Sequence, residues 1–288
     1  MMKILYILLG IIVALLVLFA ALYAVVYRAA QRLPENNPRH FIETRGPEDN
    51  TPVLVCVGDS ITHGTVSANY VDILSARLGD TGFDVVNAGI NSELAYNVAV
   101  RLDDIIACHP DYVTILIGTN DANGSLSEKK AKKQVKEMSL PQVPTKEFYR
   151  ENLYLIVKRL SEETDAKIAL LSLPPIGENI GDEACARAGE YSAVIKEIAD
   201  SERVAYLPLF EIMTNHLKEE NVRPRLAYAE TNPELVMYYG IFMHFVCNRD
   251  FDRIAKRNGF SLLVDFLHLN TRGATMVADL IEGFVSGK

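Results

Sequence analysis

The sequence predicts an α/β protein: a three-layer α/β/α sandwich around a central, mostly parallel five-stranded sheet, with one transmembrane helix at the N-terminus. Three observations lead to this prediction. From residue 53 onward, short continuous apolar runs alternate with segments of helical period, as in a parallel sheet that helices cover on both faces. The chain has 288 residues, of which 49% are hydrophobic, enough for one sizeable core. A long uncharged apolar run precedes this pattern.

The apolar run near the N-terminus covers residues 4–27 and contains no charged side chain. A helix of this length, at about 1.5 Å per residue, crosses the ~30 Å hydrocarbon layer of a bilayer. A cleavable signal peptide is the alternative, but its apolar region normally has only about 7 to 15 residues, followed by a small-x-small cleavage site. We therefore expect residues 1–28 to be an uncleaved membrane anchor.

The region after the anchor, residues 29–50, is rich in proline, asparagine and charge and shows no apolar period. This composition predicts a linker or an arm that lies along the surface. The rest of the chain, residues 51–288, is expected to form one domain with two insertions, at about 122–146 and 219–262.

The strands and helices of this domain follow from the hydrophobic pattern. Strands are expected at 53–57, 84–87, 112–117, 167–171 and 204–207, where the apolar runs are short and continuous. Helices are expected around 70–78, 94–105, 149–160, 191–198 and 276–284, where apolar residues recur at helical spacing. Thr145 is a plausible helix start and His109-Pro110 a plausible helix stop.

The two insertions are longer than most loops, and such segments are usually functional lids or contain helices of their own. The first carries a lysine cluster between residues 129 and 136, which is either a solvated helix face or a surface attracted to anionic lipid headgroups. The second contains the apolar run 235–247, which is either a buried helix or an apolar lid that touches the membrane. This run is too short for a second membrane span.

Charge and cysteine usage exclude two classes of function. The formal net charge of -8 argues against nucleic acid as a partner, because phosphate binding needs a basic surface. The cysteines lack the spacing of a zinc site, so we expect free, buried thiols and no metal. They are Cys56, Cys108, Cys185 and Cys247.

Polar residues follow several of the predicted strands, where ligands bind in an open parallel sheet. Ser60 comes just after the first strand, and a serine hydroxyl becomes a nucleophile only beside a base such as an imidazole. His268 stands near the C-terminus, and Asp265, three residues earlier, can accept the second ring N–H on the same turn. Further polar segments follow the second and third strands, at 87–91 and 118–121.

Four blocks of the sequence together resemble the SGNH subgroup of the GDSL family of serine esterases and lipases. The blocks are Gly58-Asp59-Ser60, Gly89, Gly118-Thr119-Asn120-Asp121 and Asp265-x-x-His268. The resemblance extends from about residue 51 to the end, and it implies a flavodoxin-like SGNH hydrolase domain over 51–288.

The same resemblance implies a role for each site residue. Ser60 would be the nucleophile, His268 the general base and Asp265 the carboxylate that orients it. The oxyanion hole would consist of the backbone N–H groups of Ser60 and Gly89 and the side-chain amide of Asn120. We expect structural support from the neighbouring Asp59 and Asp121. His63 could contact the substrate, but the resemblance gives the role of the base to His268.

These observations predict a membrane-anchored serine hydrolase that cleaves carboxylic esters through an acyl-enzyme and needs neither a metal nor an organic cofactor. The anchor and the apolar insertion favour a lipid-like or acylated substrate, with acetylated glycans as the second choice. Transfer of the acyl group to another acceptor, or a non-catalytic tethered scaffold, are the alternatives. The arginines after the anchor favour a cytoplasmic domain, but exported members of the family favour an extracytoplasmic one, which is our expectation.

Overall fold

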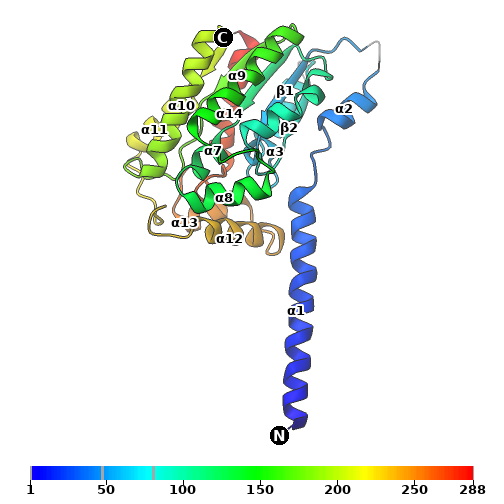
Figure 1. Ribbon diagram of the computed structural model, residues 1–288, viewed down its shortest axis with the longest axis vertical. Coiled ribbons are helices and arrows are strands. Elements are labelled where there is room, and N and C mark those ends of the chain that lie inside the picture. The colour runs from blue at the N-terminus through cyan, green and yellow to red at the C-terminus, as the bar shows by residue number, and fades with distance from the viewer. Residues whose placement is uncertain (1, 47–48, 80–81, 288) are drawn as a thin grey trace.

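The structure, a computed structural model, describes residues 2–46, 49–79 and 82–287 of the chain. Five strands form one sheet in the order β2-β1-β3-β4-β5, and every neighbouring pair is parallel. The predicted α/β/α sandwich is confirmed, and one long apolar helix precedes it (Figure 1).

The elements in chain order are α1 (Met2–Gln31), α2 (Pro38–Thr44), β1 (Val53–Gly58), α3 (Ser60–His63), α4 (Tyr70–Leu78), β2 (Asp84–Gly89), α5 (Ala95–Val100), α6 (Leu102–Ile106), β3 (Tyr112–Leu116), α7 (Thr119–Gly124), α8 (Glu128–Glu137), α9 (Lys146–Glu163), β4 (Lys167–Leu171), α10 (Glu183–Glu202), β5 (Ala205–Leu207), α11 (Leu209–Glu219), α12 (Pro233–Phe245), α13 (Phe251–Asn258) and α14 (Thr271–Ser286).

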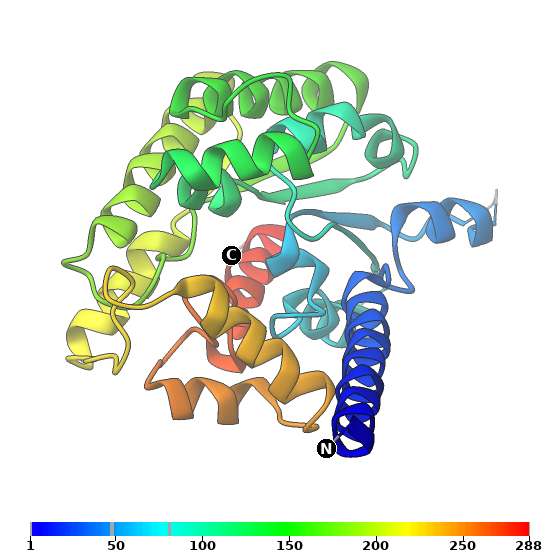
Figure 2. The same cartoon turned by 60° about the horizontal axis from the view of Figure 1, so that its bottom comes forward.

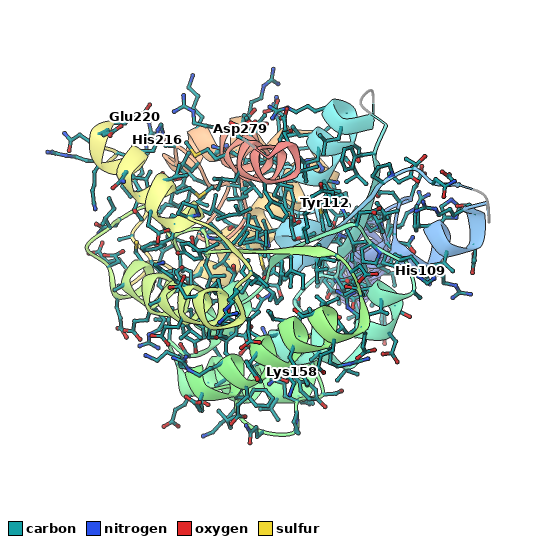
Figure 3. All side chains as sticks on the ribbon, turned by 90° about the horizontal axis from the view of Figure 1, so that it is seen from above. His109, Tyr112, Lys158, His216, Glu220 and Asp279 are labelled. Atoms are coloured by element: carbon teal, nitrogen blue, oxygen red, sulfur yellow. The ribbon has the colours of Figure 1, made fainter. Side chains whose placement is uncertain are left out.

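The sheet separates two apolar cores because successive side chains of a strand point to opposite faces. In β1, Val55 belongs to the core under α5, α6, α9 and α10, whereas Leu54 belongs to the core under α4, α11 and α14. Seen from above in Figure 3, Lys158 of α9 and Asp279 of α14 lie on opposite sides of Tyr112, which begins β3. Helices therefore cover both faces, as the continuous apolar strands predicted.

The predicted helix at 94–105 is in fact two helices, α5 and α6, which meet at Arg101. Arg101 is not helical, with φ −104° and ψ 18°. Its guanidinium pairs with Glu93 and also donates to the carbonyl oxygen of Ala88, 2.7 Å away. These tertiary contacts stabilise the non-helical conformation of Arg101, and the hydrophobic period of the sequence does not indicate the break.

Both insertions contain helices: α8 lies in the first, and α12 and α13 lie in the second. Helix α12 is not a buried helix, since Gly240 is its only buried residue. Gly240 faces Val264 and Ile254, and much of the opposite side of α12 is exposed. Cys247, which follows α12, is exposed, contrary to our expectation, whereas the other three cysteines are buried as expected; all four are free thiols.

Helix α1 leaves the body but is attached to it at one end (Figure 1). The carbonyl oxygen of Ala30 accepts hydrogen bonds from Thr65 Oγ1 and Asn91 Nδ2, both at 2.7 Å. Beyond it, Asn36 pairs with the backbone of β2, donating to Val85 and accepting from Asn87. The region 29–50 therefore includes a surface arm, and α1 is the one described helix long and apolar enough to cross a membrane.

Candidate active site

Ser60 is the first residue of α3, directly beyond the end of β1. The close turn requires glycine at position 58, because a Cβ there would lie 2.1 Å from Thr62 Oγ1 and 2.5 Å from the carbonyl oxygen of Leu116. Asp59 then caps α3, its Oδ1 accepting the N–H of Ile61 at 3.0 Å. The strand thus ends in a tight, capped turn that fixes Ser60 at the edge of the sheet.

The structure brings together the three residues that the sequence predicted as a triad. Ser60 Oγ lies 2.9 Å from Nε2 of His268, 208 positions away in the chain. His268 Nδ1 lies 2.8 Å from Oδ2 of Asp265. The other carboxylate oxygen of Asp265 accepts the backbone N–H groups of Leu267 and His268, at 2.7 and 2.9 Å. Ser60 is 9% exposed, and the other two residues less.

The electrostatics of this pair suit a base that takes up a proton. Burial acts to lower the pKa of His268, but the nearby Asp265 carboxylate outweighs burial and raises that pKa above its ordinary value. For Asp265, burial acts to raise the pKa, and the charge and hydrogen bonds of His268 outweigh it, so the pKa is lowered. Asp265 is therefore an ionised partner that stabilises the imidazolium form of His268.

A second carboxylate, which sequence reasoning missed, holds the loop that carries His268. Glu178 accepts three successive backbone N–H groups, those of Ser261, Leu262 and Leu263, at 2.6 to 2.7 Å. Its side chain is buried, and it lies in the β4–α10 connection, far away in sequence. A single buried glutamate in a loop carries no motif, so only the folded chain reveals this contact.

The same loop is also tied to the segment after α3. Ser67 Oγ donates to the carbonyl oxygen of Leu269 at 3.3 Å and accepts its N–H at 2.9 Å. The N–H of Ala68 donates to that same carbonyl at 2.8 Å. The loop of His268 is therefore fastened on two sides, which fixes the imidazole relative to Ser60.

The predicted oxyanion donors are in different situations. Asn120 Nδ2 donates one N–H to the carbonyl oxygen of Glu93 at 3.0 Å, which leaves its second N–H available. The N–H of Gly89, in contrast, already donates to Oδ1 of Asn87 at 3.0 Å. A Cβ on Gly89 would lie 2.2 Å from the backbone nitrogen of His63, so the glycine also allows β2 to approach α3 closely.

Ser92, which lines the same cavity as Asn120, has a backbone N–H without a partner among the described residues. The residue lies in the turn between β2 and α5, is exposed and has a left-handed φ of 67°. Sequence reasoning did not consider Ser92, although the polar pair Asn91-Ser92 between a strand and a helix was visible in the sequence.

Three ionisable neighbours of the site, Asp59, Asp121 and His63, are buried. Burial raises the pKa of both Asp59 and Asp121 to about 7. Asp121 Oδ2 accepts the N–H of Ala95 at 3.2 Å. Burial also lowers the pKa of His63 to about 4, and its Nδ1 lies 2.8 Å from Thr65 Oγ1.

The two insertions meet beside the site. A cavity of about 140 Å³ lies between α8 and α12, and its lining includes Asn120, Ser92, Lys130, Met237 and the 265–267 segment. Lys133 of α8 donates to Glu234 of α12 at 3.1 Å across its rim. Two larger hollows, of about 610 and 1030 Å³, border the turn after α3 and the loop before α14, and neither Ser60 nor His268 itself lines any of these three cavities. Among the described residues, no group of three or more His, Cys, Asp or Glu side chains could hold a metal ion.

A doubly covered parallel sheet with a serine, a histidine and an aspartate hydrogen-bonded in series at its edge defines an SGNH-type serine hydrolase fold. The chain belongs to the GDSL-like Lipase/Acylhydrolase family, whose model matches residues 56–275. It is accordingly a hydrolase that acts on ester bonds.

Relatives of known name support this assignment. An acetylxylan esterase of Geobacillus stearothermophilus is 27% identical over 167 residues, which are 51% of this chain and 71% of that protein. The uncharacterized lipoprotein YqeF of Bacillus subtilis (strain 168) is 31% identical over 165 residues, which are 54% of this chain and 60% of that protein.

Solved structures share the fold. The acetyl xylan esterase AlAXEase has a TM-score of 0.56 and 18% identity, over 81% of this chain and 99% of its own. The acetylxylan esterase Axe2 of Geobacillus stearothermophilus has a TM-score of 0.53 and 19% identity, over 80% of this chain and 92% of its own.

Proposed function

We propose that the protein hydrolyses carboxylic esters through an acyl-enzyme on Ser60, with His268 as general base and Asp265 as its orienting carboxylate. The observation that carries this proposal is the continuous hydrogen-bonded series from Ser60 Oγ through both ring nitrogens of His268 to Asp265. Such a series activates a hydroxyl that is otherwise a poor nucleophile at neutral pH.

The reaction proceeds in two halves. Ser60 Oγ attacks the ester carbonyl carbon while His268 Nε2 takes the hydroxyl proton, and the imidazolium then protonates the departing alcohol. In the second half His268 takes a proton from water, the hydroxide attacks the acyl-enzyme, and Ser60 recovers its proton as the carboxylic acid leaves. Asp265 stays ionised throughout and stabilises the imidazolium.

The negative charge on the carbonyl oxygen needs hydrogen-bond donors in both halves. We assign this role to the N–H of Ser60 and to the side-chain amide of Asn120. The third donor expected from the sequence is Gly89, whose N–H would have to exchange its bond with Asn87 for one with the substrate. The free N–H of Ser92, beside Asn120 on the cavity, is the alternative third donor.

For the substrate, we favour a short acyl group on a polar alcohol, such as an acetylated glycan. A cavity of about 140 Å³ suits a small acyl ester better than a long chain. Two of the similar solved structures and one similar sequence are acetylxylan esterases. A lipid-like ester is the second choice, which the apolar surface of α12 favours.

We further propose that residues 1–28 anchor the protein in a membrane and that residues 51–288, the hydrolase domain, lie outside the cytoplasm. The length and composition of α1 support the anchor, and a similar protein bears the name lipoprotein. The region 29–50 connects anchor and domain.

Replacing the nucleophile tests the reaction. Ser60→Ala should lower hydrolysis of p-nitrophenyl acetate by at least about 10⁴-fold, because Ser60 Oγ is the one hydroxyl among the described residues that is hydrogen-bonded to the His268 ring. The variant should also lose labelling by a fluorophosphonate probe while its unfolding midpoint stays close to wild type. Ser201→Ala on the surface of α10 is the control and should retain both. Undiminished turnover by Ser60→Ala would refute the proposal.

A comparison of substrates tests the acyl and alcohol classes. We expect acetate esters to be cleaved faster than palmitate esters of the same phenol, and acetylated xylo-oligosaccharides faster than phosphatidylcholine. The reverse order would favour the lipid-like substrate. Product analysis with added sugar acceptors separates hydrolysis, which releases acetate, from transfer to the acceptor.

A further inference from the structure

The apolar helix α12 carries a stripe of large side chains that stay exposed in the fold. The outer stripe of α12 consists of Leu235, Tyr238 and Phe242 and of Val246, the residue that caps the helix, which are 64, 50, 46 and 38% exposed. At about 100° per residue these positions fall within an arc of roughly 80°, so they form a single face. The helix contacts the body through Gly240 on its other side.

The position of α1 relative to the body is set by two contacts. The Ala30 carbonyl is bonded to Thr65 and Asn91, and α1 also contacts α12. Figures 1 and 2 show α12 at the end of the body from which α1 departs, crossing beside the exit of α1. The outer stripe is therefore carried on the same end of the molecule as the anchor.

The length of α1 leaves little distance between this end of the body and a bilayer. The apolar run ends at Tyr27, and Ala30, where α1 is attached, lies three residues further, about 5 Å along a helix. The headgroup layer on each side of the ~30 Å hydrocarbon core is itself about 5–7 Å thick. With α1 spanning the membrane, the attached end of the body lies within the headgroup layer.

Charge on the same end of the body matches an anionic lipid surface. Between residues 246 and 258, four basic side chains stand against two acidic ones, and α8 has five lysines against two glutamates, while the whole chain has a net charge of −8. Figure 1 shows α8 and α13 beside α12 at this end. Basic residues that flank an apolar helix face are typical of helices that lie in the membrane interface.

We propose that the outer stripe of α12 lies in the interfacial layer of the bilayer that α1 spans, so that the body rests on the membrane by a second contact. The inference rests on the membrane anchoring proposed above and adds a lipid surface as a partner of the site. Because Glu234 and Met237 of α12 line the cavity beside Asn120, the entrance to the site would then open close to the headgroups. A second copy of the chain is the less suitable occupant, since standard protein interfaces use roughly 20–30 residues a side.

Tryptophan fluorescence tests this directly, because the chain contains no tryptophan. Full-length Phe242→Trp is reconstituted into phosphatidylcholine and phosphatidylglycerol vesicles whose acyl chains are brominated near the headgroup. Its emission should be blue-shifted and quenched by roughly half by the brominated lipid. Tyr154→Trp, at a 41% exposed position on α9, is the matched control and should show almost no quenching. Leu235→Trp serves as a second reporter in case Phe242→Trp folds poorly.

The outcomes separate the two proposals. Vesicle flotation reports the anchor: protein that does not float with the vesicles refutes both anchoring and the α12 contact. Floating protein in which Phe242→Trp and Leu235→Trp are quenched no more than Tyr154→Trp keeps the anchor and overturns the α12 contact. Blue-shifted emission that resists brominated lipid but depends on the protein-to-lipid ratio also overturns it, in favour of a second copy of the chain.

Discussion

At the scale of single residues, Asp265 sets both the orientation and the basicity of His268. One of its oxygens holds the ring Nδ1 and the other holds two backbone N–H groups of the same turn. The turn and the base are therefore positioned by one side chain. Its removal should affect the chemistry more than the fold.

Asp265→Asn should lower kcat for an activated ester by about 10⁴-fold, because an amide stabilises the wrong tautomer and no imidazolium. His268 acts as a base only when it is neutral, so wild-type kcat/KM should rise with pH through a pKa above the ordinary 6.5, the raised value that Asp265 causes. In the variant burial remains and the carboxylate is gone, so the residual activity should rise at a lower pH. A pH–rate profile measures this, with the exposed Asp200→Asn as control. If activity of Asp265→Asn rose with pH through the same pKa as in the wild type, Asp265 would not be the partner of His268.

Three substitutions test which residues donate hydrogen bonds to the carbonyl oxygen of the substrate and which only allow close packing. Asn120→Ala should lower kcat by about 100- to 1,000-fold with little change in KM, the usual effect of losing one oxyanion donor. Ser92→Gly keeps the backbone N–H and relieves a left-handed φ, so the variant should stay active and gain slightly in stability. Gly89→Ala also keeps its N–H, but its Cβ would overlap His63, so it should unfold at lower temperature. Steady-state kinetics and thermal unfolding of the three variants check this; an inactive but stable Ser92→Gly would be inconsistent with it.

At the scale of elements, the loop between α13 and α14 is a catalytic element without regular structure. A single antiparallel bridge between Leu263 and Leu269 closes it, and the Glu178 carboxylate and Ser67 hold its backbone through side-chain hydrogen bonds. A loop of this kind keeps a fixed conformation only while its backbone donors have partners. Its position therefore depends on distant side chains.

Glu178→Gln tests this dependence. The amide keeps one acceptor oxygen and turns an NH₂ group towards a backbone donor, so we expect a loss of about 1–3 kcal/mol in the free energy of unfolding. The fluorophosphonate labelling rate of Ser60 should fall as well, because the imidazole is no longer held. Denaturant unfolding and labelling kinetics measure the two effects, and exposed Glu219→Gln on α11 should change neither. Wild-type labelling by a destabilised Glu178→Gln would show that the loop has other sufficient supports.

The sequence correctly predicted elements whose signals are local, such as an apolar run or a helix cap. It failed for features that depend on contacts with residues far away in the fold. The bounds of β4 at 167–171 and the start of α9 after Thr145 were predicted correctly, because an apolar run and a cap are local. The break at Arg101 depends on its contact with Glu93. The exposure of α12 depends on which side of the helix packs against Val264. In the site, the Ser60 and His268 motifs were visible, but the bond between Gly89 and Asn87 required the folded turn.

At the scale of the whole molecule, α1, the arm and the insertions all meet around the end of the sheet that carries Ser60. The arm pairs with β2, the Ala30 carbonyl is bonded beside α3, and α12 spans from the cavity to the exit of α1. The domain therefore has a defined orientation relative to α1. If α1 spans a membrane as proposed, the side that the domain faces is a separate question of topology.

The cysteines of the chain make that topology measurable. Burial raises the pKa of Cys56 and Cys108 to about 12 and that of Cys185 to about 11, so these thiols stay protonated and unreactive. In a Cys247→Ser background, Tyr154→Cys on α9 then supplies the only exposed thiol of the described chain. It lies away from α12 and so from the proposed lipid contact.

For an extracytoplasmic domain, a membrane-impermeant maleimide should label Tyr154→Cys equally in intact and in permeabilised cells. Cys247→Ser without the new cysteine should stay unlabelled in both. The arginines after the apolar run predict the opposite, because positive charges flanking a span are retained in the cytoplasm, and Arg28, Arg32, Arg39 and Arg45 outnumber Lys3 on the other side. Labelling only after permeabilisation would place the ester hydrolase inside the cell and exclude extracellular glycans as its substrates.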